Sequence, residues 1–136
     1  MLRRSGTGVA ANVVAMPRRV LVVEDDPAVL YVVTETLQDE GYEVVTAADG
    51  QAGLERVQKH RPDVVLLDYQ LPRLPAPQFV PAYRELPLAQ APIVLMTAAL
   101  RAQERCAEVQ AEGCLPKPFD LDALLAAVGR FVPPDP

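Results

Sequence analysis

The chain has 136 residues, of which 50% are hydrophobic and 23% are charged; this length fits one domain, and this composition excludes a disordered chain. The formal net charge is −5, which argues against direct binding to nucleic acid, because a phosphate backbone selects basic surfaces. No apolar run approaches the roughly 20 residues that a membrane-spanning helix needs, so we expect no membrane insertion.

Five short apolar runs alternate with helical patterns along the chain. The runs cover residues 19–24, 44–48, 63–68, 92–97 and 114–119. The first, third and fourth are nearly continuous Val, Ile and Leu, which is typical of central strands in a parallel sheet covered on both faces. Strand and helix alternating five times predict a doubly wound α/β fold, a (βα)5 domain with right-handed crossovers.

Three of the helices carry clear start and stop signals. The first is predicted to begin after an Asp26 N-cap, with Pro27 at its first position, and to end at Gly41. The second runs from about residue 50 to residue 60, before Pro62. The last begins after an Asp120 N-cap and repeats leucine and valine at helical spacing.

The other two helices are weakly signalled. Six prolines fall within residues 72–92, so the third helix is predicted to be short, about 78–86, with Pro81 in its first turn. The fourth, about 100–112, presents a buried face of small side chains that bury little area, so we expect it to be weakly held. That face consists of Ala102, Cys106 and Val109.

The two cysteines, Cys106 and Cys114, have no metal-type spacing, and the one histidine, His60, is distant in the sequence. We interpret them as free thiols of a cytoplasmic protein, where the reducing environment disfavours a disulfide. A disulfide is the less favoured alternative.

The carboxyl ends of the predicted strands carry the chain's most informative polar residues. In doubly wound sheets, function gathers at this edge. Like charges a few ångströms apart repel by roughly 4 kcal/mol per pair at an effective dielectric constant near 20, and a hard divalent cation such as Mg²⁺ relieves that repulsion. The sequence therefore predicts a site for Mg²⁺ and phosphate formed by Glu24, Asp25, Asp26, Asp68, Thr97 and Lys117.

Each of these residues also has a purely structural interpretation. Capping explains Asp26 fully, and Thr97 alone is equally an ordinary β-branched strand residue. Lys117 is harder to explain this way, because only two of the 13 basic residues are lysines and this one lies between two prolines. A compact, flexible ammonium suits a phosphoryl oxygen.

Four segments together resemble the receiver domain of bacterial two-component response regulators. They are VLVVEDDPAVL, PDVVLLDYQLP, VLMTAA and LPKPFDLDALL, and the resemblance extends from about Arg19 to Phe131. It implies a flavodoxin-like five-stranded parallel sheet in the order 2-1-3-4-5. It also implies a receiver domain over residues 18–132, between flexible tails at 1–17 and 133–136.

The resemblance implies a chemical role for each matching residue. Asp68 would accept a phosphoryl group, Lys117 would pair with one phosphoryl oxygen and Thr97 would hydrogen-bond another. Ala98 would leave room for the group, and the peptide bond from Lys117 to Pro118 would be cis.

The resemblance also implies a magnesium site. Asp25 and Asp68 would bind Mg²⁺ directly, Gln70 would contribute its backbone carbonyl, and Glu24 would act through a water molecule. The chain would catalyse only its own phosphorylation and dephosphorylation and would otherwise not be an enzyme.

The implied partners are proteins. The phosphoryl donor would be a histidine kinase or a histidine phosphotransfer protein. The chain shows no second domain, so the signal would pass in trans to an unknown target, through the face of the fourth helix, fifth strand and fifth helix.

Three alternatives are open. The chain would be a phosphorylation-independent interaction module if it kept the fold without the chemistry. A haloacid-dehalogenase-like phosphatase is disfavoured because Gln70 stands where such enzymes place an acid-base aspartate. A flavodoxin-like cofactor binder is disfavoured because the first loop, EDDPA, is acidic.

The chain departs from the family pattern around the expected switch. Residues 73–77 replace the usual loop, and the segment between Thr97 and Lys117 is about two residues shorter than usual. Cys114 stands where the family places an aromatic ring that moves inward. We therefore expect the weakly held fourth helix to respond, with amide exchange changing across residues 98–114 on phosphorylation.

Overall fold

A computed structural model describes residues 18–133, and their strands form one parallel sheet in the order β2-β1-β3-β4-β5. This confirms the predicted fold class and strand order. The predicted N-terminal tail, 1–17, and all but the first residue of the predicted C-terminal tail, 133–136, lie outside the described residues. The strands are β1 Arg19–Val23, β2 Glu43–Ala47, β3 Val64–Asp68, β4 Ile93–Ala98 and β5 Gly113–Lys117.

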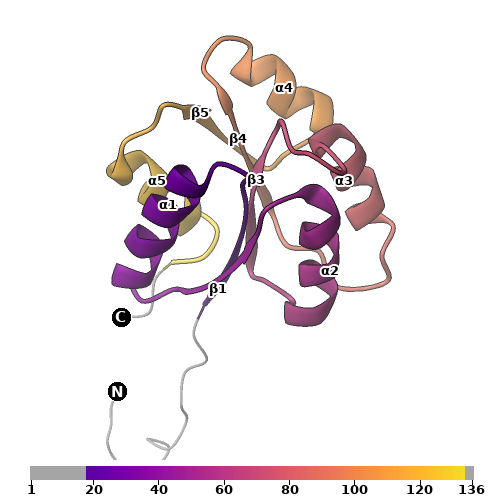
Figure 1. Ribbon diagram of the computed structural model, residues 1–136, viewed down its shortest axis with the longest axis horizontal. Coiled ribbons are helices and arrows are strands. Elements are labelled where there is room, and N and C mark those ends of the chain that lie inside the picture. The colour runs from indigo at the N-terminus through magenta and orange to yellow at the C-terminus, as the bar shows by residue number, and fades with distance from the viewer. Residues whose placement is uncertain (1–17, 134–136) are drawn as a thin grey trace, which may run out of the picture.

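Helices cover both faces of this sheet (Figure 1): α1 and α5 lie on one side, and α2, α3 and α4 lie on the other. Among residues 18–133, no helix combines the length and the apolar character needed to cross a lipid bilayer. The helices are α1 Pro27–Asp39, α2 Gly50–His60, α3 Ala76–Arg84, α4 Ala102–Val109 and α5 Leu121–Gly129.

The sheet separates two apolar cores. Because side chains alternate along a strand, Leu66 of β3 packs toward α1 and α5, while Leu67 packs toward α2 and α3. Every residue of β3 is buried, including the terminal Asp68. Each fully buried leucine or valine contributes about 1.5–3 kcal/mol, so the position of Asp68 is set by the strand that precedes it.

The strand register brings the predicted polar residues to one edge. Val23 pairs with Leu67 in the ladder, so Glu24 follows β1 where β3 reaches Asp68. In the next two ladders Asp68 pairs with Met96, and Ala98 pairs with Lys117. The parallel sheet thus places residues from four strands at its carboxyl edge.

The predicted helix caps are present. The Asp26 carboxylate accepts hydrogen bonds from the backbone N–H groups of Ala28 at 2.9 Å and Val29 at 3.3 Å. Asp120 accepts from Ala123 at 2.7 Å, and Gly41 follows α1 with a φ of 94°. Capping therefore accounts for Asp26.

The prediction for the third helix was wrong in its start and in its treatment of Pro81. The helix spans Ala76–Arg84, and Pro81 lies inside it, beyond the first turn. Proline there removes one backbone hydrogen bond, but Phe79 and Tyr83 on the same helix are almost fully buried. Burial of these two rings outweighs the weak local propensity.

The expectation of free thiols was also wrong, because Cys106 and Cys114 form a disulfide with a Cα–Cα distance of 6.0 Å. Ala102, Cys106 and Val109 form the buried face of α4, as predicted. That face packs against β5 and brings Cys106 opposite Cys114. The pairing depends on how α4 lies on the sheet, which sequence spacing does not reveal.

Candidate functional site

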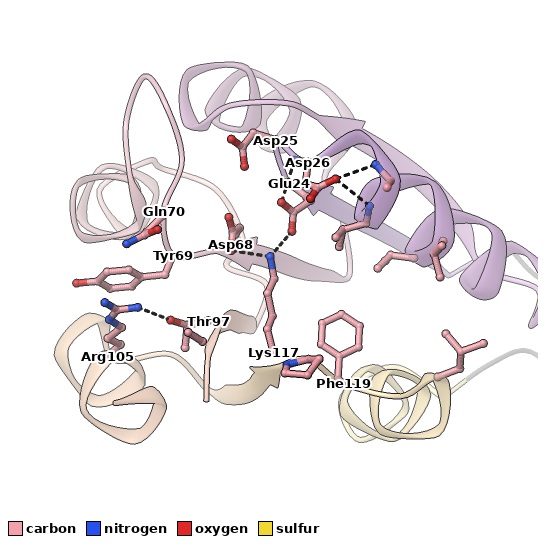
Figure 2. Close-up of a pocket in the computed structure, with 17 residues that line it drawn as sticks. Glu24, Asp25, Asp26, Asp68, Tyr69, Gln70, Thr97, Arg105, Lys117 and Phe119 are labelled. Carbon is pink, nitrogen blue, oxygen red and sulfur yellow. Dashed lines mark hydrogen bonds and ion pairs between the residues drawn. The ribbon is translucent and has the colours of Figure 1, made fainter. Parts of the chain in front are cut away.

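A cleft of about 930 Å³ opens at the carboxyl edge of the sheet (Figure 2). Its walls come from the β1–α1 loop and α1, the β3–α3 loop, the end of β4, α4, the β5–α5 loop and the start of α5. All the predicted site residues line it, namely Glu24, Asp25, Asp26, Asp68, Gln70, Thr97, Ala98 and Lys117. Their convergence is established by the structure, whereas their individual roles remain predictions.

Lys117 bridges two of the acids. Its Nζ lies 2.7 Å from Glu24 Oε1 and 3.1 Å from Asp68 Oδ1 (Figure 2). Burial lowers the pKa of Lys117, but the hydrogen bond to Glu24 and the negative charge of Asp68 more than offset this, and the net pKa is raised. Lys117 therefore remains an ammonium near neutral pH. The bond from Lys117 to Pro118 is cis, as the resemblance implies.

Asp68 lies in an environment that resists its negative charge. Burial, followed by the charge of Glu24, raises the pKa of Asp68 from its ordinary 3.8 to about 6, although Lys117 opposes the shift. One ammonium thus does not compensate the acids around it. The local charge balance favours another cation in the cleft.

The same residues fit a magnesium ion. Carboxylate oxygens of Glu24, Asp25 and Asp68 all lie within 4.8 Å of one another, and oxygen ligands are those that Mg²⁺ prefers. Both Glu24 oxygens already have partners, because Oε1 accepts from Lys117 and Oε2 accepts from the Asp26 N–H at 3.0 Å. Glu24 is therefore better suited to an indirect role than Asp25, whose side chain is exposed.

Sequence reasoning missed a polar cluster next to Thr97. Thr97 is buried, and its hydroxyl accepts a hydrogen bond from Arg105 Nη1 at 3.0 Å. The Arg105 guanidinium lies 4.5 Å from the centre of the Tyr69 ring, and the Tyr69 hydroxyl donates to Glu108 at 2.8 Å. Arg105 lies on α4, eight positions after Thr97 of β4. The sequence does not define how α4 is oriented on the sheet, so no sequence signal pointed to Arg105.

The loop after Asp68 has an unusual backbone. Arg73 and Leu74 have φ values of 50° and 90°, a region that side chains other than glycine rarely adopt. The start of α2 holds this loop through two backbone hydrogen bonds. The Gly50 N–H donates to the Pro72 carbonyl oxygen at 3.2 Å, and the Gln51 N–H donates to the Arg73 carbonyl oxygen at 2.8 Å. The predicted departure from the family loop therefore lies just beyond Tyr69 and Gln70, the residues of this loop that line the cleft.

The single histidine lies far from the cleft. His60 is the last residue of α2, and its carbonyl oxygen accepts a hydrogen bond from Arg19, the first residue of β1. His60 is therefore at the amino edge of the sheet. His60 does not line the cleft.

A family model for the response regulator receiver domain matches residues 20–129. The chain belongs to this family. This receiver domain is 37% identical over 118 residues to a transcriptional regulatory protein, PdtaR, of Mycobacterium tuberculosis, covering 84% of the chain and 56% of the relative. It is 39% identical over 125 residues to the response regulator MprA of Mycolicibacterium vanbaalenii, covering 88% of the chain and 54% of that relative. The chain thus spans about half the length of these relatives.

Solved structures agree with this assignment. The chemotaxis response regulator CheY4 of Vibrio cholerae matches with a TM-score of 0.78 and 36% identity, covering 86% of the receiver domain and 100% of CheY4. The receiver domain of a sensor histidine kinase from Pseudomonas aeruginosa matches with a TM-score of 0.78 and 28% identity, covering 85% and 98% of the two chains. That second structure has a magnesium ion coordinated in its active-site cleft.

Proposed function

We propose that Asp68 accepts a phosphoryl group from a histidine kinase or a histidine phosphotransfer protein in a cytoplasmic two-component phosphorelay. The observation that carries this proposal is the placement of Lys117 Nζ, 3.1 Å from the Asp68 carboxylate at the end of a buried strand. With a pKa of about 6, Asp68 is mostly ionised at pH 7, so it needs no general base to act as a nucleophile.

The transfer then requires only positioning and charge neutralisation. An Asp68 oxygen forms the new P–O bond while the donor's P–N bond breaks, and the electron pair of that bond stays on the donor imidazole. Lys117 holds the carboxylate in place and offsets the charge of the phosphoryl oxygens. Thr97, at the end of β4, offers its hydroxyl to one of them.

Magnesium is the proposed cofactor. Asp25 and Asp68 would bind it directly, Gln70 would add its backbone carbonyl, and Glu24 would act through water because both of its oxygens are engaged. When bound, Mg²⁺ supplies positive charge to the acceptor carboxylate and to the incoming phosphoryl group. The catalytic activity would be limited to the domain's own phosphorylation and dephosphorylation.

The signal is proposed to leave through the face formed by α4, β5 and α5, toward a protein partner in trans. The residues nearest to the acceptor support this route. Thr97 contacts Arg105 of α4, and Lys117 lies at the end of β5, directly before the loop to α5. Charge-assisted hydrogen bonds of about 1.5–3 kcal/mol are large enough to shift a conformational equilibrium many-fold.

Acetyl phosphate with Mg²⁺ tests the proposal without a cognate kinase. Intact mass spectrometry should show the gain of one phosphoryl group by the wild type and none by Asp68→Ala. Chelation of Mg²⁺ should abolish the gain. A natively folded wild type that stays unmodified would instead support the phosphorylation-independent interaction module.

A further inference from the structure

Arg105 brings a second cationic side chain to the cleft. It belongs to α4, is half-buried and lines the same cleft as Asp68 and Lys117. Figure 2 shows its guanidinium beside Thr97 and under the Tyr69 ring, on the side of the cleft away from Glu24. The acceptor carboxylate therefore lies in a cleft with one cation from β5 and another from α4.

Arg105 has no acidic partner at ion-pair distance among the described residues. Within residues 18–133, none of the ion pairs at 4.0 Å or less involves Arg105. Glu108, on the same helix, is hydrogen-bonded to the Tyr69 hydroxyl instead. The contacts that hold the guanidinium are with the neutral groups of Thr97 and Tyr69. A guanidinium has five N–H donors, and within the part of the chain that the structure describes, that of Arg105 makes one hydrogen bond, to Thr97.

We propose that Arg105 is a phosphoryl-binding residue that couples α4 to the modification of Asp68; this rests on the proposed function. The Thr97 hydroxyl that accepts from Arg105 keeps its own O–H to donate to a phosphoryl oxygen. A planar guanidinium next to that hydroxyl adds charge-assisted hydrogen bonds to the same group.

The surrounding contacts explain why this coupling would suit the chain. Cys114 stands at the position where the family resemblance places a mobile aromatic ring, and its sulfur is bonded to Cys106. A ring cannot move inward there. Arg105 precedes Cys106 on α4, so a phosphoryl group that draws the guanidinium toward Asp68 acts directly on the helix.

Beryllofluoride, a phosphoryl mimic, with Mg²⁺ tests this inference by calorimetric titration of three proteins. Arg105→Gln should bind it about tenfold more weakly than the wild type, the effect of losing roughly one charge-assisted hydrogen bond. Arg101→Gln is the matched control, because it removes the same charge from the start of the same helix. Arg101 is exposed, lies 3.8 Å from Glu104 and is outside the cleft lining, so its variant should stay within about twofold.

Two further measurements separate phosphoryl binding from a structural role. Mg²⁺ affinity without beryllofluoride should not fall in Arg105→Gln, whereas a distorted cleft would lower it. In the wild type, the NMR signal of the Arg105 Nε–H should shift and gain exchange protection when beryllofluoride is added, while that of Arg101 should not. This second readout needs no variant to fold.

The outcomes distinguish this inference from the proposed function. A wild type that binds no beryllofluoride and takes up no phosphoryl group overturns both. A wild type that is phosphorylated, with equal beryllofluoride affinity in Arg105→Gln, overturns the role of Arg105 alone. Equal weakening in the Arg101 and Arg105 variants would assign the effect to overall charge and also overturn it.

Discussion

At the scale of single residues, the cleft is a site of unfavourable charge that the fold maintains. Glu24 is 1% exposed and Asp68 is 7% exposed, so water screens their repulsion poorly. Lys117 relieves part of it. The remaining imbalance makes the cleft receptive to a cation and has measurable consequences in the metal-free protein.

Replacing Asp68 by Asn should stabilise the metal-free protein in a pH-dependent way. Folding raises the pKa of Asp68 from 3.8 to about 6, so the protonated Asp68 side chain favours the folded state. This contribution to the free energy of unfolding is fully present below pH 3.8 and is lost as the pH rises through 6. Asp68→Asn cannot ionise, so at pH 8 it should be more stable than the wild type, on the order of 1–3 kcal/mol.

Urea unfolding with a chelator, at pH 4 and at pH 8, measures this difference. The two proteins should differ less at pH 4 than at pH 8. A difference that is the same at both values, or an Asn variant that is the less stable one at pH 8, would contradict the assigned charge environment.

Replacing Asp25 should weaken metal binding, whereas replacing its neighbour Asp26 should leave metal binding unchanged. Mg²⁺ at about 100 times its dissociation constant should stabilise the wild type by roughly 2.7 kcal/mol. Asp25→Asn removes a carboxylate from the acidic group and should abolish most of that gain. Asp26→Asn is the control, because asparagine caps a helix as well as aspartate.

The melting temperature of each variant, with and without Mg²⁺, is the measurement. Equal losses of the magnesium effect in both variants would show that general negative charge, and not Asp25 itself, holds the ion.

At the scale of elements, α4 is held by a covalent bond that its small side chains did not suggest. The disulfide joins Cys106 on α4 to Cys114 on β5, eight positions apart. Closing a loop of this size stabilises a protein by roughly 2–3 kcal/mol in the chain-entropy treatment. The predicted response of residues 98–114 to phosphorylation therefore depends on whether the bond is oxidised.

Reduction with dithiothreitol should loosen α4. Amide exchange across residues 98–114 should accelerate, while exchange in β1 and β3, which are buried, should change little. The double variant Cys106→Ser/Cys114→Ser should show the fast exchange without reductant and should not respond to it. Identical exchange in the oxidised and reduced wild type would mean that the bond does not restrain the helix.

Gly50, the first residue of α2, allows the helix to pack closely against the β3–α3 loop. An added Cβ at Gly50 would overlap the backbone carbonyl of Leu74, which is a group that cannot rotate away. Gly50→Ala should destabilise the protein by about 1–3 kcal/mol, although alanine normally favours a helix. Gly129 at the end of α5 has nothing within 4 Å of an added Cβ, so Gly129→Ala should stabilise by about 0.5–1 kcal/mol.

Chemical denaturation of the two variants tests the sign of each effect. A Gly50→Ala protein that is as stable as the wild type, with a shifted loop, would contradict the expected cost and show that the contact with Leu74 gives way easily. The loop position is read from the amide shifts of residues 69–75.

At the scale of the whole molecule, the sequence predicted those features that arise from local pattern and from topology. Near-continuous apolar runs identified β3 and its neighbours, because strands buried on both faces have no polar positions. Parallel strands then had to bring Glu24, Asp68 and Lys117 to one edge. The helix caps at Asp26 and Asp120 could be predicted from the sequence because capping is a local hydrogen bond.

The tertiary structure alone decided the rest, because those features depend on how elements lie on each other. The bond between Cys106 and Cys114 and the contact of Arg105 with Thr97 both follow from the orientation of α4 on the sheet. The extent of α3 follows from the burial of Phe79 and Tyr83, which outweighs a proline in the helix. Local sequence determines which side chains are available at the edge of the sheet, and long-range packing determines which of them meet.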